Sequence, residues 1–168
     1  MPIQSERKGT NLKSGVLLSV IIIIFFTSAA QAVGENYFLE FKELSGQAVL
    51  RLPLQSDETF TIRYIHSVDK TPVFEIFETD HKGRLTLQAT YFKMFGAGMG
   101  HWQGRGFIDF DGKWTWIKNI HEPLGSFILR VGSLPVNHTL LYRKQEISLS
   151  KKWAGKRLQV TVTGNSNK

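Results

Sequence analysis

Two ionisable side chains, His66 and Glu75, stand out in the stretch RYIHSVDKTPVFE, residues 63–75. Both occupy positions where the alternating pattern of a β-strand calls for apolar residues. A histidine next to a carboxylate can form a buried polar pair, hold a ligand or move a proton. The question is which of these the surrounding chain permits.

Residues 69–72, Asp-Lys-Thr-Pro, have the composition of a turn, so the flanking segments are predicted to form a hairpin. Pairing Ser67 with Pro72 would place His66 diagonal to Glu75. Pairing Val68 with Val73 would place His66 directly opposite Glu75. In both registers a buried carboxylate needs a partner. We favour a structural polar pair, and a ligand site is the alternative.

Catalytic chemistry finds little support in the sequence. Ser67 follows His66 directly, so in a strand the two side chains point to opposite faces. Asp109 and Asp111 lie at a predicted hairpin turn, where aspartate serves turn hydrogen bonds. We therefore expect no enzyme.

The five histidines are His66, His81, His101, His121 and His138, and none has a second histidine at ligand spacing. We expect no bound metal. If strands bring distant residues together, His66, Glu75 and His101 are the alternative metal set.

A glycine-rich loop, GAGMGHWQGRG, covers residues 96–106. It lacks the Gly-Lys-Ser/Thr ending of a phosphate-binding loop and no helix follows, so no nucleotide cofactor is expected. Gly96 and Gly98 permit close backbone approach. Met99, His101 and Trp102 at the tip are candidates for contact with a ligand or partner. The alternative for Trp102 is core filling.

The remaining segments alternate with period two and are separated by turn residues, as in antiparallel sheets. About ten short strands and one helical turn near residues 150–154 predict an all-β fold, a single antiparallel β-sandwich or flattened barrel. The domain is predicted over residues 33–164, followed by a disordered tail at 165–168. The chain has no cysteine, which excludes disulfides and thiolate metal sites.

The N-terminus is predicted to direct export. A basic segment precedes an apolar run at residues 15–26, which is shorter than the about 20 residues of a membrane span. Ala30-Gln31-Ala32 fits a signal-peptidase site, so residues 1–32 are expected to be a signal peptide and the protein periplasmic. The alternative is an uncleaved inner-membrane anchor at residues 16–28, with the domain facing the periplasm.

The chain is basic, with 21 Lys and Arg against 14 Asp and Glu, a net charge of +7. Residues 1–32 contribute three basic residues and one acidic residue, +2, which leaves +5 for the remainder. Lys151, Lys152, Lys156 and Arg157 cluster near the C-terminus. Their charge favours a solvated basic face, and contact with an anionic membrane surface is the alternative. Export makes nucleic acid an unexpected partner.

Several stretches together resemble one family of small exported proteins, the domain of unknown function 1850. They are FTIRYIHSVDKTPVFEIFE, YFKMFGAG, DFDGKWTW, and ILRVG followed by NHTLLYRKQEISL. The likeness runs from about Tyr37 to Val162, and Met99-Gly100 departs from it. The resemblance implies no known activity. It implies that the protein is encoded beside a tripartite ATP-independent periplasmic transporter of the kind that uses a TAXI-type solute-binding protein.

Two functions are expected to compete. The first is an accessory module that docks on a transporter membrane subunit or its TAXI-type solute-binding protein. The second is a small-molecule or ion binder with its site near His66, Glu75 and residues 96–106. A flat aromatic patch with basic rims would favour the first function, and a pocket lined by those residues would favour the second. An enzyme is a third and weaker possibility.

Overall fold

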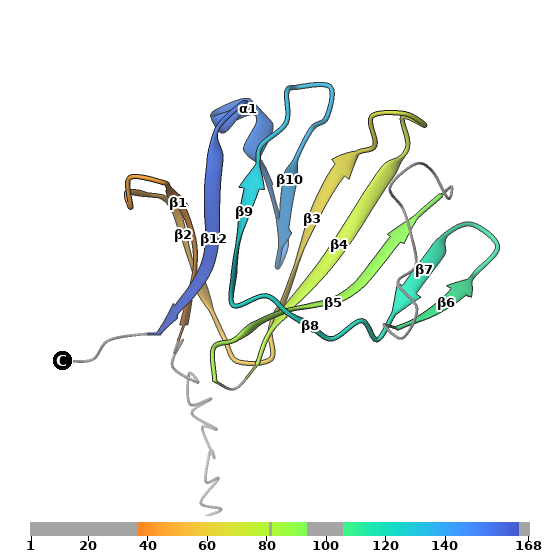
Figure 1. Cartoon of the computed structure of the whole chain (residues 1–168), viewed down its shortest axis with the longest axis horizontal. Helices are drawn as coiled ribbons and strands as arrows, with labels where there is room; N and C mark the ends of the chain where they lie inside the picture. The colour runs from red at the N-terminus through yellow and green to blue at the C-terminus, as the bar shows by residue number, and fades with distance from the viewer. Residues whose placement is uncertain (1–36, 81, 94–105, 165–168) are drawn as a thin grey trace, which may run out of the picture. The chain divides into compact units, whose positions relative to one another are not determined.

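Two antiparallel sheets account for nearly all of the computed structural model, which describes residues 37–80, 82–93 and 106–164 (Figure 1). The four-stranded sheet has the order β2 (Ala48–Leu54), β1 (Tyr37–Glu43), β12 (Arg157–Gly164) and β9 (Ser126–Arg130). The eight-stranded sheet has the order β11 (Gln145–Ser148), β10 (Thr139–Tyr142), β3 (Thr59–Ile65), β4 (Pro72–Thr79), β5 (Leu85–Phe92), β7 (Thr115–Lys118) and β6 (Phe107–Phe110), and β8 (Glu122–Pro123) pairs with β5.

The predicted all-β, sandwich-like class is confirmed, and the details differ in two places. The alternation of residues 139–149 predicts one strand, but residues 139–148 fold back as the hairpin β10–β11, with Arg143 at a positive φ of 51° in the turn, and Leu149 begins α1. The two-residue strand β8 was not predicted. The expected helical turn is α1 (Leu149–Trp153), which the Ser148 side chain caps by accepting a hydrogen bond from the Lys151 backbone.

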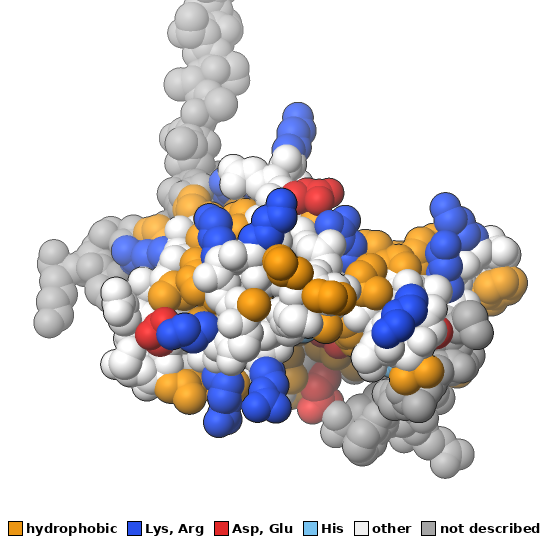
Figure 2. Space-filling view, turned by 90° about the horizontal axis from the view of Figure 1, so that it is seen from above, with side chains coloured by type: hydrophobic (Ala, Val, Ile, Leu, Met, Phe, Trp, Pro, Cys, Tyr) orange, Lys and Arg blue, Asp and Glu red, His pale blue; other side chains and the backbone are white. Residues whose placement is uncertain are grey.

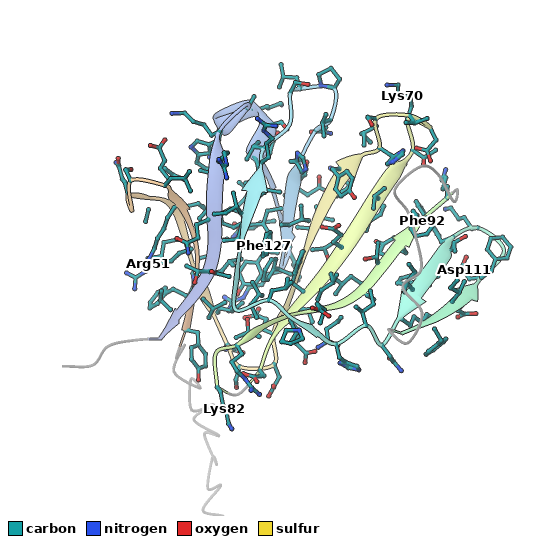
Figure 3. All side chains as sticks on the ribbon, viewed as in Figure 1. Arg51, Lys70, Lys82, Phe92, Asp111 and Phe127 are labelled. Carbon is teal, nitrogen blue, oxygen red and sulfur yellow. The ribbon has the colours of Figure 1, made fainter. Side chains whose placement is uncertain are left out.

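The main hydrophobic core lies between the two sheets and follows the alternation of their strands. Phe127 of β9 stacks on Phe77 of β4 with ring centroids 5.2 Å apart, and Phe77 stacks on Phe60 of β3 at 5.1 Å (Figure 3). These rings join the two sheets, because β9 belongs to one and β3 and β4 to the other. The fully buried side chains around them include Leu39, Phe41, Leu54, Ile62, Leu85, Leu140, Leu149 and Leu158.

A second, smaller core lies on the same face of the eight-stranded sheet, toward its β6 edge. It consists of Val73, Phe92 and Ile117, with Tyr64 and Ile120 packed against them. Glu75 lies on β4 between Val73 of this cluster and Phe77 of the main core, so its side chain points to the same buried face.

Four connections gather at one end of the sandwich. They are the β1–β2 turn, the β3–β4 turn, the β9–β10 loop and the segment of α1 leading into β12 (Figure 1). Within the described ranges, no helix has the length and apolar character needed to span a membrane. The predicted signal peptide, residues 1–32, and the predicted tail, residues 165–168, lie outside the described residues.

Among the glycines that the structure describes, Gly106 is predicted to be the least tolerant of a side chain. Its φ is +69°, and an added Cβ would lie 2.4 Å from the Lys118 carbonyl oxygen. Gly106→Ala should lower the free energy of unfolding by about 2–4 kcal/mol, from backbone strain plus the clash. Gly112→Ala, at φ +85° with nothing within 4 Å, should cost only about 1–2 kcal/mol. Urea unfolding of both variants measures the difference, and equal losses would contradict this packing.

Candidate functional site

The predicted pair of His66 and Glu75 is not formed, and both predicted registers are wrong. Strand β3 ends at Ile65, which lies opposite Pro72, so Ile62 faces Glu75 across the ladder. His66 is in the turn, where its Nδ1 lies 2.9 Å from Asp69 Oδ1. Both side chains of that pair are nearly covered, at 11% and 10% exposure. The backbone N–H of Thr71 and the charge of His66 outweigh burial and lower the pKa of Asp69.

Glu75 finds a different partner, the hydroxyl of Tyr64. Tyr64 lies opposite Val73 on β3, diagonal to Glu75 on the same sheet face. Burial raises the pKa of Glu75 to about 7, and the hydrogen bond from Tyr64 only partly offsets it. Burial and the neighbouring Glu75 charge raise the pKa of Tyr64 in turn. Glu75 as a whole is partly exposed, but its carboxyl group is enclosed enough for desolvation to dominate its pKa.

His138 extends this buried polar group toward the end loops. Its ring lies 5.3 Å from the Tyr64 ring, and its Nδ1 accepts a hydrogen bond from the Gly132 backbone at 2.9 Å. Its backbone N–H donates to Ser150 Oγ, and that hydroxyl donates to the Gly132 carbonyl. Because Nδ1 is an acceptor, neutral His138 carries its proton on Nε2, and burial lowers its pKa.

This buried group has limited chemistry. A carboxyl whose pKa lies near 7 can exchange a proton at neutral pH, as a ligand-binding acid would. Among the described residues, no set of three His, Cys, Asp or Glu side chains is placed to hold a metal ion. The predicted site residues Gly96, Gly98, Met99, His101 and Trp102 all lie outside the described residues.

The opposite face of the eight-stranded sheet carries an aromatic row that sequence reasoning missed. The row consists of successive cross-strand neighbours, namely Arg63 on β3, Phe74 on β4, Tyr91 on β5, Trp116 on β7 and Asp109 on β6. Strand alternation places them on the outer face, because their neighbours Val73, Phe92 and Ile117 point into the core. We call Phe74, Tyr91, Trp114 and Trp116 the aromatic face.

The rings of the aromatic face contact one another closely. Phe74 and Tyr91 stack with centroids 4.3 Å apart, and Tyr91 and Trp116 stack at 4.2 Å. Trp114 meets Phe74 and Tyr91 edge-on, at 5.5 and 5.4 Å. Each ring is partly exposed, and none of the four belongs to either core cluster of the described residues. The signal in the sequence was WTWI, whose alternation puts both tryptophans on one face.

Cations border the aromatic face. Lys93 lies over the Trp114 ring at 5.4 Å, and Lys118 lies over the Trp116 ring at the same distance. Arg63 extends the row beyond Phe74 and pairs with Glu146 at 3.2 Å. The aromatic surface is therefore bordered by cations, of which Arg63 and Lys118 are paired with Glu146 and Asp109.

Asp111 holds the tip of this surface in place. Its Oδ1 accepts hydrogen bonds from the Lys113 and Trp114 backbones, and its Oδ2 accepts one from Trp116 Nε1 at 2.9 Å. Asp109 instead pairs with Lys118 across the hairpin. The interpretation of Asp111 as a turn residue is confirmed.

The raised pKa of Glu75 predicts an unusual pH dependence. Its folded pKa of about 7 exceeds the reference 4.5, so folding favours the protonated acid. Its contribution to stability is greatest below about pH 4.5 and declines as pH rises through about 7, by about 3 kcal/mol in total. Glu75→Gln keeps a neutral side chain, so at pH 8 it should exceed the parent in stability by about 2–3 kcal/mol, a gain that shrinks toward pH 5.

Tyr64→Phe is the matched second variant. It keeps a ring against His138 but removes the donor to the Glu75 carboxylate, so the pKa of Glu75 should rise further. The decline in stability should still begin near pH 4.5 but continue to a higher pH and become larger in total. Urea unfolding from pH 5 to pH 8 measures both effects. A Glu75→Gln gain that is constant across this range would contradict the buried acid.

Comparison with known proteins returns one match. The family model described as "Domain of unknown function (DUF1850)" matches residues 60–149, from β3 to the start of α1. The matched range is shorter than the range of the resemblance, from about Tyr37 to Val162. No curated protein and no solved structure matches the chain. Because the family model spans more than half of the 168 residues and includes both the buried acid and the aromatic face, the chain belongs to the family of proteins with the domain of unknown function DUF1850.

Proposed function

We propose that this protein is an exported interaction module that docks onto a partner protein through the aromatic face. The observation that carries the proposal is the row of four partly exposed rings bordered by cations on one sheet face. A patch of this kind was expected for an accessory module, and a pocket was expected for a small-molecule binder.

The composition of the aromatic face suits protein contact. Trp, Tyr and Arg are the residue types that most often carry binding energy in interfaces. Stacked rings lose little conformational freedom on binding, since Phe74, Tyr91 and Trp116 already hold one another in place. The side chains of the aromatic face therefore lose little conformational entropy when a partner covers them.

The rim charge indicates what kind of partner fits. Lys93, over the Trp114 ring, favours an acidic group on the partner beside an apolar centre, whereas Lys118 and Arg63 are already paired with Asp109 and Glu146. The family resemblance supplies the setting, a tripartite ATP-independent transporter. We propose its TAXI-type solute-binding protein as the partner, and the transporter membrane subunit as the alternative. Export, and a periplasmic location, are part of this proposal.

The buried acid supports a second candidate, a small-molecule or ion binder. Glu75 has a pKa near 7 and lies on the face of the sheet that carries Phe92, the last residue of β5. This function would use proton exchange at Glu75 rather than the aromatic face. The two candidates therefore predict different sensitive residues.

Trp116→Ala should weaken binding to the solute-binding protein by at least about 30-fold, as expected when an interface anchor worth about 2 kcal/mol is removed. Phe110→Ala is the matched control. Phe110 lies on the same hairpin, is 63% exposed and points to the other face. Isothermal titration with the TAXI-type solute-binding protein of the same organism measures both affinities.

Glu75→Gln separates the two candidate functions in the same assay. The docking module requires that this variant bind its partner like the parent protein. If Trp116→Ala binds as tightly as Phe110→Ala, the aromatic face is not the docking surface. If the solute-binding protein shows no binding to the parent, and the transporter membrane subunit shows none either, the proposed partnership is wrong.

A further inference from the structure

The end of the sandwich that carries α1 has apolar side chains at three separate tips. Leu44 in the β1–β2 turn is 59% exposed, Val68 in the β3–β4 turn is 66% exposed, and Leu134 in the β9–β10 loop is 62% exposed. The other exposed large apolar residues of the described chain lie elsewhere, on β6 (Phe107, Ile108, Phe110) and on β9 (Ile128), and these three tips are the most exposed ones apart from Phe110. Figure 2 views the molecule from this end and shows hydrophobic side chains among lysines and arginines.

Backbone hydrogen bonds join these tips into one surface. The Ile65 N–H donates to the Val136 carbonyl at 2.7 Å, which ties the β9–β10 loop to the end of β3. Val131 and Lys156 are linked at 2.9 Å, which ties the same loop to the start of β12. Residues 43–45 and 155–157 line a shallow depression of about 360 Å³, which brings Leu44 beside this segment.

The same end is strongly basic. Its exposed cations are Lys70, Arg130, Lys151, Lys152, Lys156 and Arg157. Its carboxylates are Glu43, which pairs with Lys156 at 3.3 Å, and Asp69, which pairs with His66. The positive charge therefore exceeds the negative charge by several units.

Two of these cations face each other directly. Arg130 of β9 lies opposite Arg157 of β12 in the ladder, and like charges in that position repel. Neither guanidinium has an ion-pair partner among the described carboxylates. A phosphate group bound at this end would offset the repulsion.

We propose that this end of the sandwich docks on a membrane surface that contains anionic lipid. The tips carrying Leu44, Val68 and Leu134 enter the headgroup region, and the surrounding lysines and arginines contact lipid phosphates. This surface is distinct from the aromatic face, so the inference goes beyond the proposed function. A free phosphate would use the cations but leave the three apolar tips without a role.

A cysteine-free chain allows a direct test with one fluorescent probe. Leu134→Cys, labelled with a polarity-sensitive dye, should shift to the blue on vesicles of phosphatidylcholine with phosphatidylglycerol. Lys82→Cys places the same dye at the opposite end, where Figure 3 shows Lys82 far from Lys70, and should not shift. Both probes are placed on the same full chain, so residues 1–36 are common to the two measurements.

Two double variants test whether membrane binding requires the positive charge of this end. The double variant Lys152→Gln with Arg157→Gln should need a lipid concentration about 25-fold higher for the same response of the Leu134 probe. Each removed charge accounts for about fivefold of this change. Lys82→Gln with Lys144→Gln removes the same charge from the other end and should leave the response unchanged. Raised salt should weaken binding.

Three results with vesicles, and one with free phosphate, would overturn the membrane inference. The first is no blue shift of the Leu134 probe on phosphatidylglycerol vesicles. The second is an equal shift on vesicles of phosphatidylcholine alone. The third is equal weakening by the two charge pairs, which would show a response to net charge alone. Free inorganic phosphate that displaces the protein at low concentration would assign the cations to a soluble anion instead.

Discussion

The register between β3 and β4 is the constraint on which the rest of the structure depends. With Ile62 opposite Glu75, every even-numbered side chain of β3 and every odd-numbered side chain of β4 faces the core. If β3 shifted by one residue against β4, Phe60 and Ile62 would turn outward. Arg63 would then point into the core beside Glu75, so the core and the outer row would both be disrupted.

This register gives the two faces of the eight-stranded sheet different roles, with a buried acid on the inner face and an aromatic row on the outer face. Glu75 lies on the buried face, with Tyr64 as its donor and a raised pKa. Phe74, the preceding residue, lies on the outer face in contact with Tyr91 and Trp114. The bulge between Ile76 and Phe77 lies beyond these residues, so the row from Arg63 to Asp109 stays in register across five strands. A continuous flat ladder of side chains is what a docking surface requires.

Much of the fold follows from the sequence, because alternation and turn residues are local signals. Ser45-Gly46 and residues 111–113 mark their hairpins, and the Ser148 cap accompanies the short helix. The register of the central hairpin did not follow, because slips by two residues preserve the apolar pattern. The structure resolves it through turn chemistry. Lys70 adopts a positive φ of 56°, its N–H donates to the His66 carbonyl, and Asp69 pairs with His66.

The candidate site was predicted in part. Glu75 was expected to be a buried acid in need of a partner, but the partner is Tyr64, which lies two residues before His66 on β3. The aromatic face escaped notice because Phe74, Tyr91, Trp114 and Trp116 are the residue types that also fill cores. Only the placement of β5 between β4 and β7, a non-local feature, puts these rings side by side.

Hydroxyl-radical footprinting of the complex with the TAXI-type solute-binding protein is the most direct test of the docking surface. Radical oxidation reports the solvent exposure of individual aromatic side chains. The account predicts that Trp114, Trp116 and Tyr91 become protected in the complex, while Phe110 is oxidised as in the free protein. Unchanged oxidation of both tryptophans in a complex that has formed would contradict the assignment of this face.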